Sequence, residues 1–346
     1  MSETNLTPLE QNTQLITEID ALVDALPDAG SGGGGDANPT AVSKAVNFID
    51  FDGTIRYSYT LDEVAALTDL PALPAHDGLV CQGWNWTLTD IKALGREVTV
   101  GAVYITDDGK TRLYITIDQT DRMTVPIWLT QAVANGVTVD WGDGSAVETS
   151  ETVVTDIQFS HTYAMTGDYV IKLGVVGNGT VVLGQHYANN MMDGTSSGGL
   201  FGDQNNSVCA GMLTKIELGA GLISLNAHAL SGCANLKTVT QPTGLVRVGD
   251  SELAGNRVKS YTVPPSVTEI GPNAFYASDI SSVSIPKSVT VIGKDAFYET
   301  NCHTIFIPDG VETIMGGICG TNLTRLVFPS SVTSIGSSSS GGGVLE

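Results

Sequence analysis

A period of 22 residues in the C-terminal half constrains the fold of this chain more than any other feature. Proline recurs with this spacing, or one residue less, at Pro242, Pro264, Pro286, Pro308 and Pro329. Each proline follows or ends a short, partly apolar stretch, and these stretches are Leu213–Leu218, Leu236–Gln241, Val258–Val263, Ile280–Ile285, Cys302–Ile307 and Leu323–Phe328. One such unit cannot bury its apolar face alone, so neighbouring units must stack. The repeats therefore predict a solenoid of short strands over residues 213–336.

Within each repeat strand, the first, fourth and sixth residues are mostly apolar, as at Ile280, Val283 and Ile285. The second, third and fifth residues are mostly polar. Proline closes the strand at a point where no backbone donor is needed. This pattern predicts that the apolar positions share one core, while the other positions form continuous surfaces along successive turns.

The pattern SVTxIGxxAF, at Ser266–Phe275 and Ser288–Phe297, together with strands that end in Ile-Pro, resembles the BspA-like leucine-rich repeat. The resemblance implies a leucine-rich-repeat solenoid that binds partners, as in bacterial adhesins and phage-encoded proteins. Residues 337–346 form a Ser/Gly-rich tail in place of the expected Ala-Phe turn. We therefore expect the last repeat to be incomplete, with its cap missing or supplied by another chain.

The fifth strand position changes from polar to apolar along the repeats, as Glu217, Thr240, Thr262, Ser284, Phe306 and Val327. We expect Phe306 and Val327 to lie exposed beside each other, surrounded by His303, Thr304 and Arg325. Aromatic and arginine side chains commonly anchor binding sites, and an apolar patch with a polar rim often marks one. The alternative is that the last turn or a partner subunit covers Phe306.

Residues 121–180 predict a β-sandwich. The segment Trp141-Gly142-Asp143-Gly144 is followed by His161-Thr162-Tyr163 and by the alternating strand Gly167–Val175, and this order resembles the PKD domain, an immunoglobulin-like sandwich. The resemblance implies a spacer or adhesion module. Asp140 and Asp143 suit either a calcium ion or the stabilisation of a turn, and we favour the turn. Residues 181–212 are interpreted as a connecting and capping segment.

Residues 40–120 predict a small α+β module. Strands are expected at Val46–Ile49 and Arg56–Tyr59, with a short helix over Leu61–Thr68 capped by Thr60. Val98–Thr106 and Thr111–Ile117 flank Asp108-Gly109, which predicts a hairpin. At least one of Trp84 and Trp86 is expected in the core.

One segment of this module, Asp50-Phe51-Asp52-Gly53-Thr54, matches the DxDGT nucleophile loop of haloacid-dehalogenase-type phosphatases. That chemistry would need a parallel, doubly wound sheet behind the loop, and the sequence up to residue 118 leaves no room for one. We interpret the segment as a strand followed by an Asp-Gly turn.

Residues 1–29 are predicted to form a helix. Residues 30–39 are a Gly-rich linker that connects this helix to the rest of the chain. The helix carries a seam of residues spaced by three and four, formed by Leu9, Asn12, Ile16, Ile19, Val23 and Leu26. Such a seam suits a coiled coil, in which a buried Asn sets register, and we expect a homo-oligomer, with a trimer favoured. The alternative is a single amphipathic helix that docks on its own chain.

The net charge of −21, from 37 acidic and 16 basic residues, disfavours binding to nucleic acid. No stretch has the length of a membrane span, so membrane insertion is not expected. The five cysteines form no CxxC pair, and we interpret them as small buried hydrophobes. The sequence has no HExxH or P-loop motif, and we expect neither an enzyme nor a bound metal or cofactor. The fold class predicted is mainly β.

The order of parts also resembles leucine-rich-repeat proteins that phages and prophages of gut bacteria encode. The resemblance rests on Val46–Thr54 and on Gln82–Leu88, which includes Gly83-Trp84-Asn85-Trp86. It implies a tail-fibre-like virion protein that binds a glycan or protein of the host surface and contacts other tail proteins. The alternative is an extracellular adhesin on the bacterial cell surface. The start of the chain has no basic, apolar signal segment, which favours the first interpretation.

Overall fold

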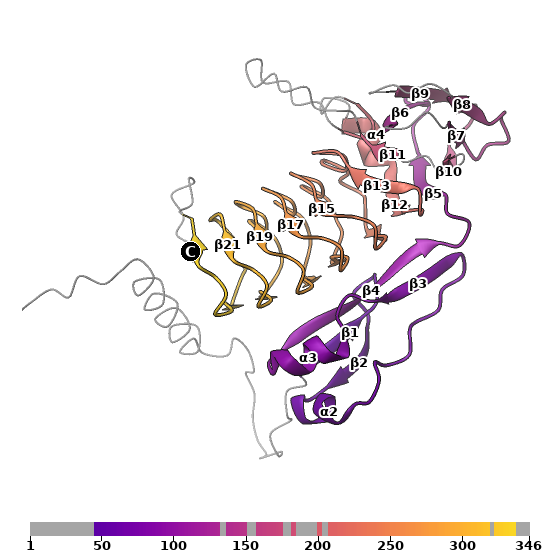
Figure 1. The fold of residues 1–346 in the computed structure, drawn as a ribbon. Coiled ribbons are helices and arrows are strands. Elements are labelled where there is room, and N and C mark those ends of the chain that lie inside the picture. The colour runs from indigo at the N-terminus through magenta and orange to yellow at the C-terminus, as the bar shows by residue number, and fades with distance from the viewer. Residues whose placement is uncertain are drawn as a thin grey trace, which may run out of the picture.

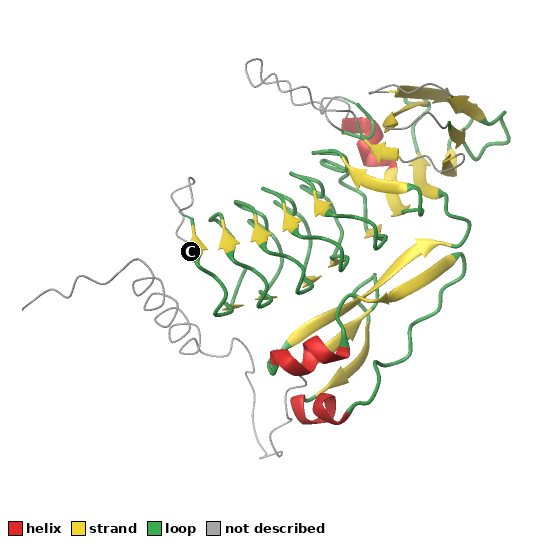
Figure 2. Ribbon diagram, in the orientation of Figure 1, coloured by secondary structure: helices red, strands yellow, loops and turns green. Residues whose placement is uncertain are grey.

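The structure is a computed structural model, and it describes residues 45–131, 136–150, 157–175, 181–184, 199–202, 207–318 and 322–336. The predicted oligomerisation helix, the Gly-rich linker and the C-terminal tail lie outside these residues. The described chain is mainly β, with a solenoid that carries a β-sandwich at one end and a small α+β body along one side (Figures 1 and 2). None of its described helices is long and apolar enough to cross a membrane.

The small α+β body, residues 45–106, is called the small module here. Its elements are β1 (Val46–Ile49), β2 (Ile55–Tyr59), α2 (Leu61–Ala66), β3 (Leu79–Trp84), α3 (Leu88–Leu94) and β4 (Val98–Thr106). The strands form one sheet in the order β2-β1-β4-β3, in which only β1 and β4 run parallel. Phe48 and Trp84 pack edge to face in its core, with ring centroids 5.0 Å apart. Both Trp84 and Trp86 are buried, which confirms the prediction for this pair.

Threonine side chains cap the starts of both helices of the small module, and the sequence predicted the first of these caps. Thr60 forms a capping box with Glu63 at the start of α2, and Thr87 caps α3 through the amide of Asp90. After β1 the chain turns at Gly53, whose φ of 87° requires glycine. The segment Asp50–Thr54 is therefore a strand end followed by a tight turn, as its sequence predicts.

The sandwich is built from β5 (Thr111–Ile117), β6 (Thr124–Gln131), β7 (Val137–Asp140), β8 (Glu148–Ser150), β9 (Ile157–Thr162), β10 (Gly167–Val175) and β11 (Val181–Leu183). One sheet has the order β8-β7-β10-β5 and the other β9-β6-β11. Trp141 is fully buried between them, and its carbonyl accepts a hydrogen bond from the hydroxyl of Tyr163 at 2.9 Å. Asp140 and Asp143 accept the amides of Gly142 and Ser145, so both carboxylates stabilise the acidic turn.

The predicted hairpin at Asp108-Gly109 is wrong. The chain does turn there, but β4 pairs with β1 and β3 of the small module, while β5 pairs with β10 and β12. A turn signal fixes a local change of direction and does not choose the partner of the strand that follows it. The strand Thr111–Ile117, which the sequence assigned to the small module, therefore belongs to the sandwich sheet.

The solenoid begins with α4 (Ser207–Met212), and its strands lie on two edges. The predicted repeat strands appear as β12 (Leu213–Glu217), β14 (Thr238–Val239), β16 (Ser260–Thr262), β18 (Ser282–Ser284), β20 (Thr304–Phe306) and β22 (Arg325–Val327). The second edge carries β13 (Leu222–Leu225), β15 (Arg247–Val248), β17 (Glu269–Ile270), β19 (Val291–Ile292), β21 (Thr313–Ile314) and β23 (Ser334–Ile335). The last five of these form one parallel sheet.

Both sandwich sheets continue into the first turn of the solenoid. Strand β12 pairs with β5, and β13 pairs with β11. The buried side chains of the sandwich and the solenoid consequently form one hydrophobic core. A solenoid end exposes unpaired backbone and core, and here the sandwich covers that end by extending its sheets.

Candidate binding surface of the repeats

The repeat strands bury the side chains that the period predicts. Ile280, Val283 and Ile285 of one turn are all buried, and Phe275 stacks on Phe297 of the next turn with ring centroids 5.0 Å apart. Cys209, Cys233 and Cys302 are buried as well, as expected of small apolar side chains. The core of the solenoid is therefore set by the repeat itself.

The fifth strand positions do not form a free surface over the first turns, contrary to the expectation from the sequence. Glu217, Thr240, Thr262 and Ser284 are all buried. Other parts of the same chain cover this face, so its polar residues are contact residues and not solvent-exposed ones. The sequence-based view of one continuous exposed fifth-position row is wrong for these four residues.

The sandwich supplies the cover at Glu217. The hydroxyl of Tyr114 donates a hydrogen bond to Oε2 of Glu217 at 2.8 Å, and Nζ of Lys215 lies 2.6 Å from Oε1. Burial and the nearby Glu217 carboxylate raise the pKa of Tyr114 to about 12. The phenol therefore stays protonated and donating at neutral pH, which satisfies a carboxylate that would be costly to bury alone.

The small module supplies the cover over the next turns, and glycine permits its close approach. A Cβ atom on Gly101 would lie 2.2 Å from Oγ1 of Thr262, and one on Gly53 would lie 2.9 Å from Cβ of Ser260. Such distances are shorter than van der Waals contact. Strand β4 can therefore lie against β16 only because position 101 has no side chain.

Asn85 is the polar centre of this contact. Its Nδ2 donates to the carbonyl of Val263 at 3.0 Å and lies 2.9 Å from Oγ of Ser284. Its Oδ1 accepts the amide of Gly101 at 2.8 Å, and Ser284 also donates to the carbonyl of Thr99 at 2.6 Å. Because Asn85 is buried, these bonds are made where an unpaired amide would cost about 1–3 kcal/mol.

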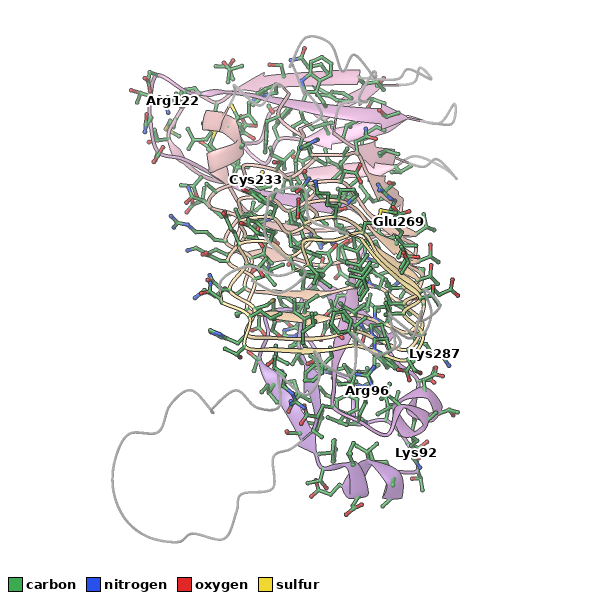
Figure 3. All side chains as sticks on the ribbon, turned by 90° about the vertical axis from the view of Figure 1, so that its left-hand side faces the viewer. Lys92, Arg96, Arg122, Cys233, Glu269 and Lys287 are labelled. Atoms are coloured by element: carbon green, nitrogen blue, oxygen red, sulfur yellow. The ribbon has the colours of Figure 1, made fainter. Side chains whose placement is uncertain are left out.

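Further contacts extend the docking toward the last turns. The indole Nε1 of Trp86 donates to the carbonyl of Ile285 at 3.0 Å. Ion pairs join Lys287 to Asp90 at 2.8 Å, Arg96 to Asp309 at 3.0 Å, and Arg325 to Glu97. Figure 3 shows Arg96 between the small module and the solenoid. These pairs are partly exposed, so they orient the module more than they stabilise it.

The predicted binding residues fall at the edge of this docked module. His303 and Arg325 are exposed, whereas Thr304 and Phe306 are half-buried. Strands β20 and β22 pair so that Phe306 lies opposite Val327, as the repeat predicts, but the side chain of Val327 lies outside the described residues. Arg325 is engaged by Glu97 of the small module. Whether this group binds a partner stays a prediction.

Sequence reasoning missed Asn85, Trp86 and Gly101 as interface residues. The Gly83-Trp84-Asn85-Trp86 run was a usable signal, because an Asn buried beside two large apolar rings needs hydrogen-bond partners from elsewhere. Gly101 carried no signal, since a glycine within a predicted strand also fits a bulge or a weak strand.

Asp50, the first residue of the DxDGT match, is held by a network of its neighbours. Oδ1 accepts the hydroxyl of Tyr104 at 2.7 Å, and Oδ2 accepts Nε of Arg56 at 2.8 Å and lies 2.8 Å from Nε2 of His76. Burial alone would raise the pKa of Asp50, but these hydrogen bonds outweigh it and lower that pKa. Both carboxylate oxygens thus serve a buried structural cluster that ties β1, β2 and β4 together.

The row that remains exposed along the repeats is the second strand position. Lys237, Lys259, Ser281, His303 and Thr324 are exposed in successive turns, and this set is called the second-position row here. In these turns the first strand residue is buried or half-buried, so the second residue points outward, because side chains alternate along a strand. Of the residues proposed from the sequence, only His303 belongs to this row.

Comparison with known proteins identifies the repeats. Residues 205–318 match the family described as BspA type Leucine rich repeat region, in 6 copies. No curated protein matches the chain. Among solved structures, a leucine-rich repeat protein from Bacteroides ovatus is similar, with 21% identity over 36% of this chain and a TM-score of 0.34. The match spans 33% of that protein's chain. Residues 205–318 of the chain are thus similar to BspA-type leucine-rich repeats.

Proposed function

We propose that this protein is a non-enzymatic attachment protein that binds a bacterial surface through the exposed edge of its repeats. The observation that carries the proposal is the second-position row, in which Lys237 to Thr324 repeat at one place on successive turns. A row of exposed side chains at equivalent positions of stacked turns suits an extended partner, because successive turns present their side chains along one line. The BspA-type repeats support the same class of function.

The rest of the molecule supports the solenoid and leaves that edge exposed. The sandwich extends both sheets into the first turn, and the small module lies against the strand face. Asp50 supports a non-enzymatic interpretation, since Tyr104, Arg56 and His76 occupy the oxygens that a nucleophile would need to present. We expect no hydrolysis of an aryl phosphate in the presence of Mg²⁺.

The finer proposal is a tail-fibre-like protein of a phage particle, as the order of its modules suggests. Its partners would be other tail proteins and a glycan or protein of the host surface, and its helix would assemble a homo-oligomer. A bacterial surface adhesin is the second candidate, and the BspA-type repeats favour it. Mass spectrometry of purified phage particles and of the cell-surface fraction from the source strain would separate the two.

The attachment proposal is tested by binding of labelled full-length protein to a panel of bacteria. His303→Ala removes a ring from the second-position row. It should weaken attachment by about tenfold, which corresponds to about 1.4 kcal/mol, and should leave the melting temperature nearly unchanged, because His303 is exposed. Tyr276→Ala is the matched control, because Tyr276 is an exposed ring on another part of the solenoid. If His303→Ala attaches like the wild type, the second-position row does not carry attachment. If the wild-type protein binds none of the bacteria, the attachment proposal fails.

A further inference from the structure

A group of exposed basic residues lies at the sandwich end of the second-position row. Lys237 and Lys259 occupy the same position in neighbouring turns, and Arg257 precedes the strand of the second of these turns. Arg122 reaches the same place from the sandwich, since it lines a cleft together with Lys237. These four residues, Arg122, Lys237, Arg257 and Lys259, are called the basic edge here.

The turns that carry the basic edge are directly bonded to one another. The amide of Lys237 donates to the carbonyl of Thr214 at 3.0 Å, and the amide of Arg257 donates to that of Leu236 at 2.9 Å. Neighbouring strands in such a stack lie about 5 Å apart. Like charges at this spacing are destabilising unless something compensates them.

The basic edge forms no ion pair with a carboxylate in the described part of the chain, although Asp118 lines the cleft beside it. The second edge of the same solenoid behaves differently, because Arg247 there pairs with Asp250 and with Glu269 of the next turn. Figure 3 shows Arg122 and Glu269 on opposite sides of the molecule. Four basic side chains without ion pairs thus lie together on one edge of a chain whose net charge is −21.

The cleft beside the basic edge offers more than positive charge. It has a volume of about 370 Å³, which is within the usual range for small-molecule sites. Neutral hydrogen-bonding side chains line it, among them Thr116, Gln119 and Thr214. The carboxylate of Asp118 also lines it, and a carboxylate accepts hydrogen bonds from hydroxyl groups but repels phosphates.

We propose that the basic edge and this cleft bind an acidic polysaccharide, whose carboxylates meet the cations while its hydroxyls bond to the neutral groups and Asp118. The mixture of cations, amides, hydroxyls and one carboxylate fits a sugar acid better than a nucleic acid, whose backbone presents phosphate at every unit. The stacked turns match a polymer with regularly spaced charges. This inference rests on the proposed attachment function and names the chemical class of its ligand.

The test uses full-length protein and a galacturonic-acid oligosaccharide as the probe, with binding measured by calorimetry at low and at physiological salt. The variant Lys237→Gln/Arg257→Gln/Lys259→Gln should bind the probe at least tenfold more weakly. The matched control, Lys110→Gln/Lys172→Gln/Lys294→Gln, changes the net charge equally at other places and should bind like the wild type. Binding should weaken as salt rises, because exposed charges are screened. Thermal unfolding of each variant checks that it is folded.

Four outcomes overturn the inference. Equal losses in the two triple variants would mean that overall charge and not the basic edge is responsible. Equal binding of a neutral dextran oligosaccharide would remove the role of the carboxylates, and tighter binding of duplex DNA would make the ligand a nucleic acid. A protein that attaches to bacteria but does not bind the acidic probe refutes this inference alone, whereas a protein that attaches to no bacteria refutes the proposed function.

Discussion

Replacing Gly101 by Ala tests whether docking of the small module depends on the close approach of β4 to β16. The new Cβ would lie 2.2 Å from Oγ1 and 2.5 Å from Cγ2 of Thr262. Ordinary contact between such atoms is about 3.5–4.0 Å, so the two surfaces must separate by about 1 Å or more. The backbone of β4 itself can accept alanine, because Gly101 has no left-handed φ.

The magnitude follows from the hydrogen bonds that such a separation would break. They join Ser284 to Thr99 at 2.6 Å, Asn85 to Val263 at 3.0 Å, and Trp86 to Ile285 at 3.0 Å. A further 1 Å takes each of them beyond hydrogen-bonding distance. At about 1 kcal/mol each, the loss is about 3 kcal/mol, or roughly a hundredfold in the equilibrium between docked and undocked states.

Hydrogen exchange followed by mass spectrometry measures this change. In Gly101→Ala, peptides that cover Asn85–Thr87 and Ser284–Lys287 should exchange roughly a hundredfold faster than in the wild type. Gly244→Ala is the control, because its Cβ meets no atom within 4 Å. Adding Thr262→Gly removes the atoms that clash and should restore most of the protection. If Gly101→Ala exchanges like the wild type, or if Thr262→Gly gives no rescue, the close approach does not govern docking.

Three further predictions concern buried polar groups. Burial raises the pKa of Glu252 to about 7, from an ordinary 4.5, so its contribution to stability is full below pH 4.5 and is lost as the pH rises toward 7. Between pH 4 and pH 7.5, wild-type stability in urea should therefore fall by about 3 kcal/mol relative to Glu252→Gln, and parallel pH profiles for the two would contradict the argument. Gln241 occupies a sixth strand position, where other turns carry residues such as Val263 and Ile285, and its buried amide has no hydrogen-bond partner among the described residues. Gln241→Leu should raise the free energy of unfolding by about 1–3 kcal/mol, and an unchanged or lower melting temperature would count against it. Asp50→Asn should lower the free energy of unfolding by about 2–3 kcal/mol at pH 7, because it weakens charged hydrogen bonds to Arg56, His76 and Tyr104. A carboxylate whose pKa is lowered by folding stabilises the folded state at neutral pH and loses this contribution as it becomes protonated in acid. The difference in stability between wild type and Asp50→Asn should therefore shrink as the pH falls below 4. A difference independent of pH would refute this assignment.

Periodicity in the sequence was sufficient to predict the solenoid and its core. The 22-residue spacing located the strands at β16, β18 and β20, and alternation identified Ile280, Val283 and Ile285 as buried. Local signals also worked where they act within a few residues. The Asp-Gly turn after β1 and the Thr60 cap both formed as predicted, because the groups involved are neighbours along the chain.

Only the tertiary structure decided which surface stays free. Thr262 and Ser284 have the small polar side chains of a solvent-exposed row, yet β4 covers them, because small residues are also what close packing between two sheets requires. The pairing of β5 with β10 and β12, instead of with β4, likewise depends on partners far away in the sequence. A repeat pattern predicts which side of a strand faces the core of the solenoid. It does not predict which other part of the chain packs against the opposite side. Contacts such as those of Asn85 with Val263 and Ser284 therefore arise from the packing of separate bodies, which no local pattern in the sequence encodes.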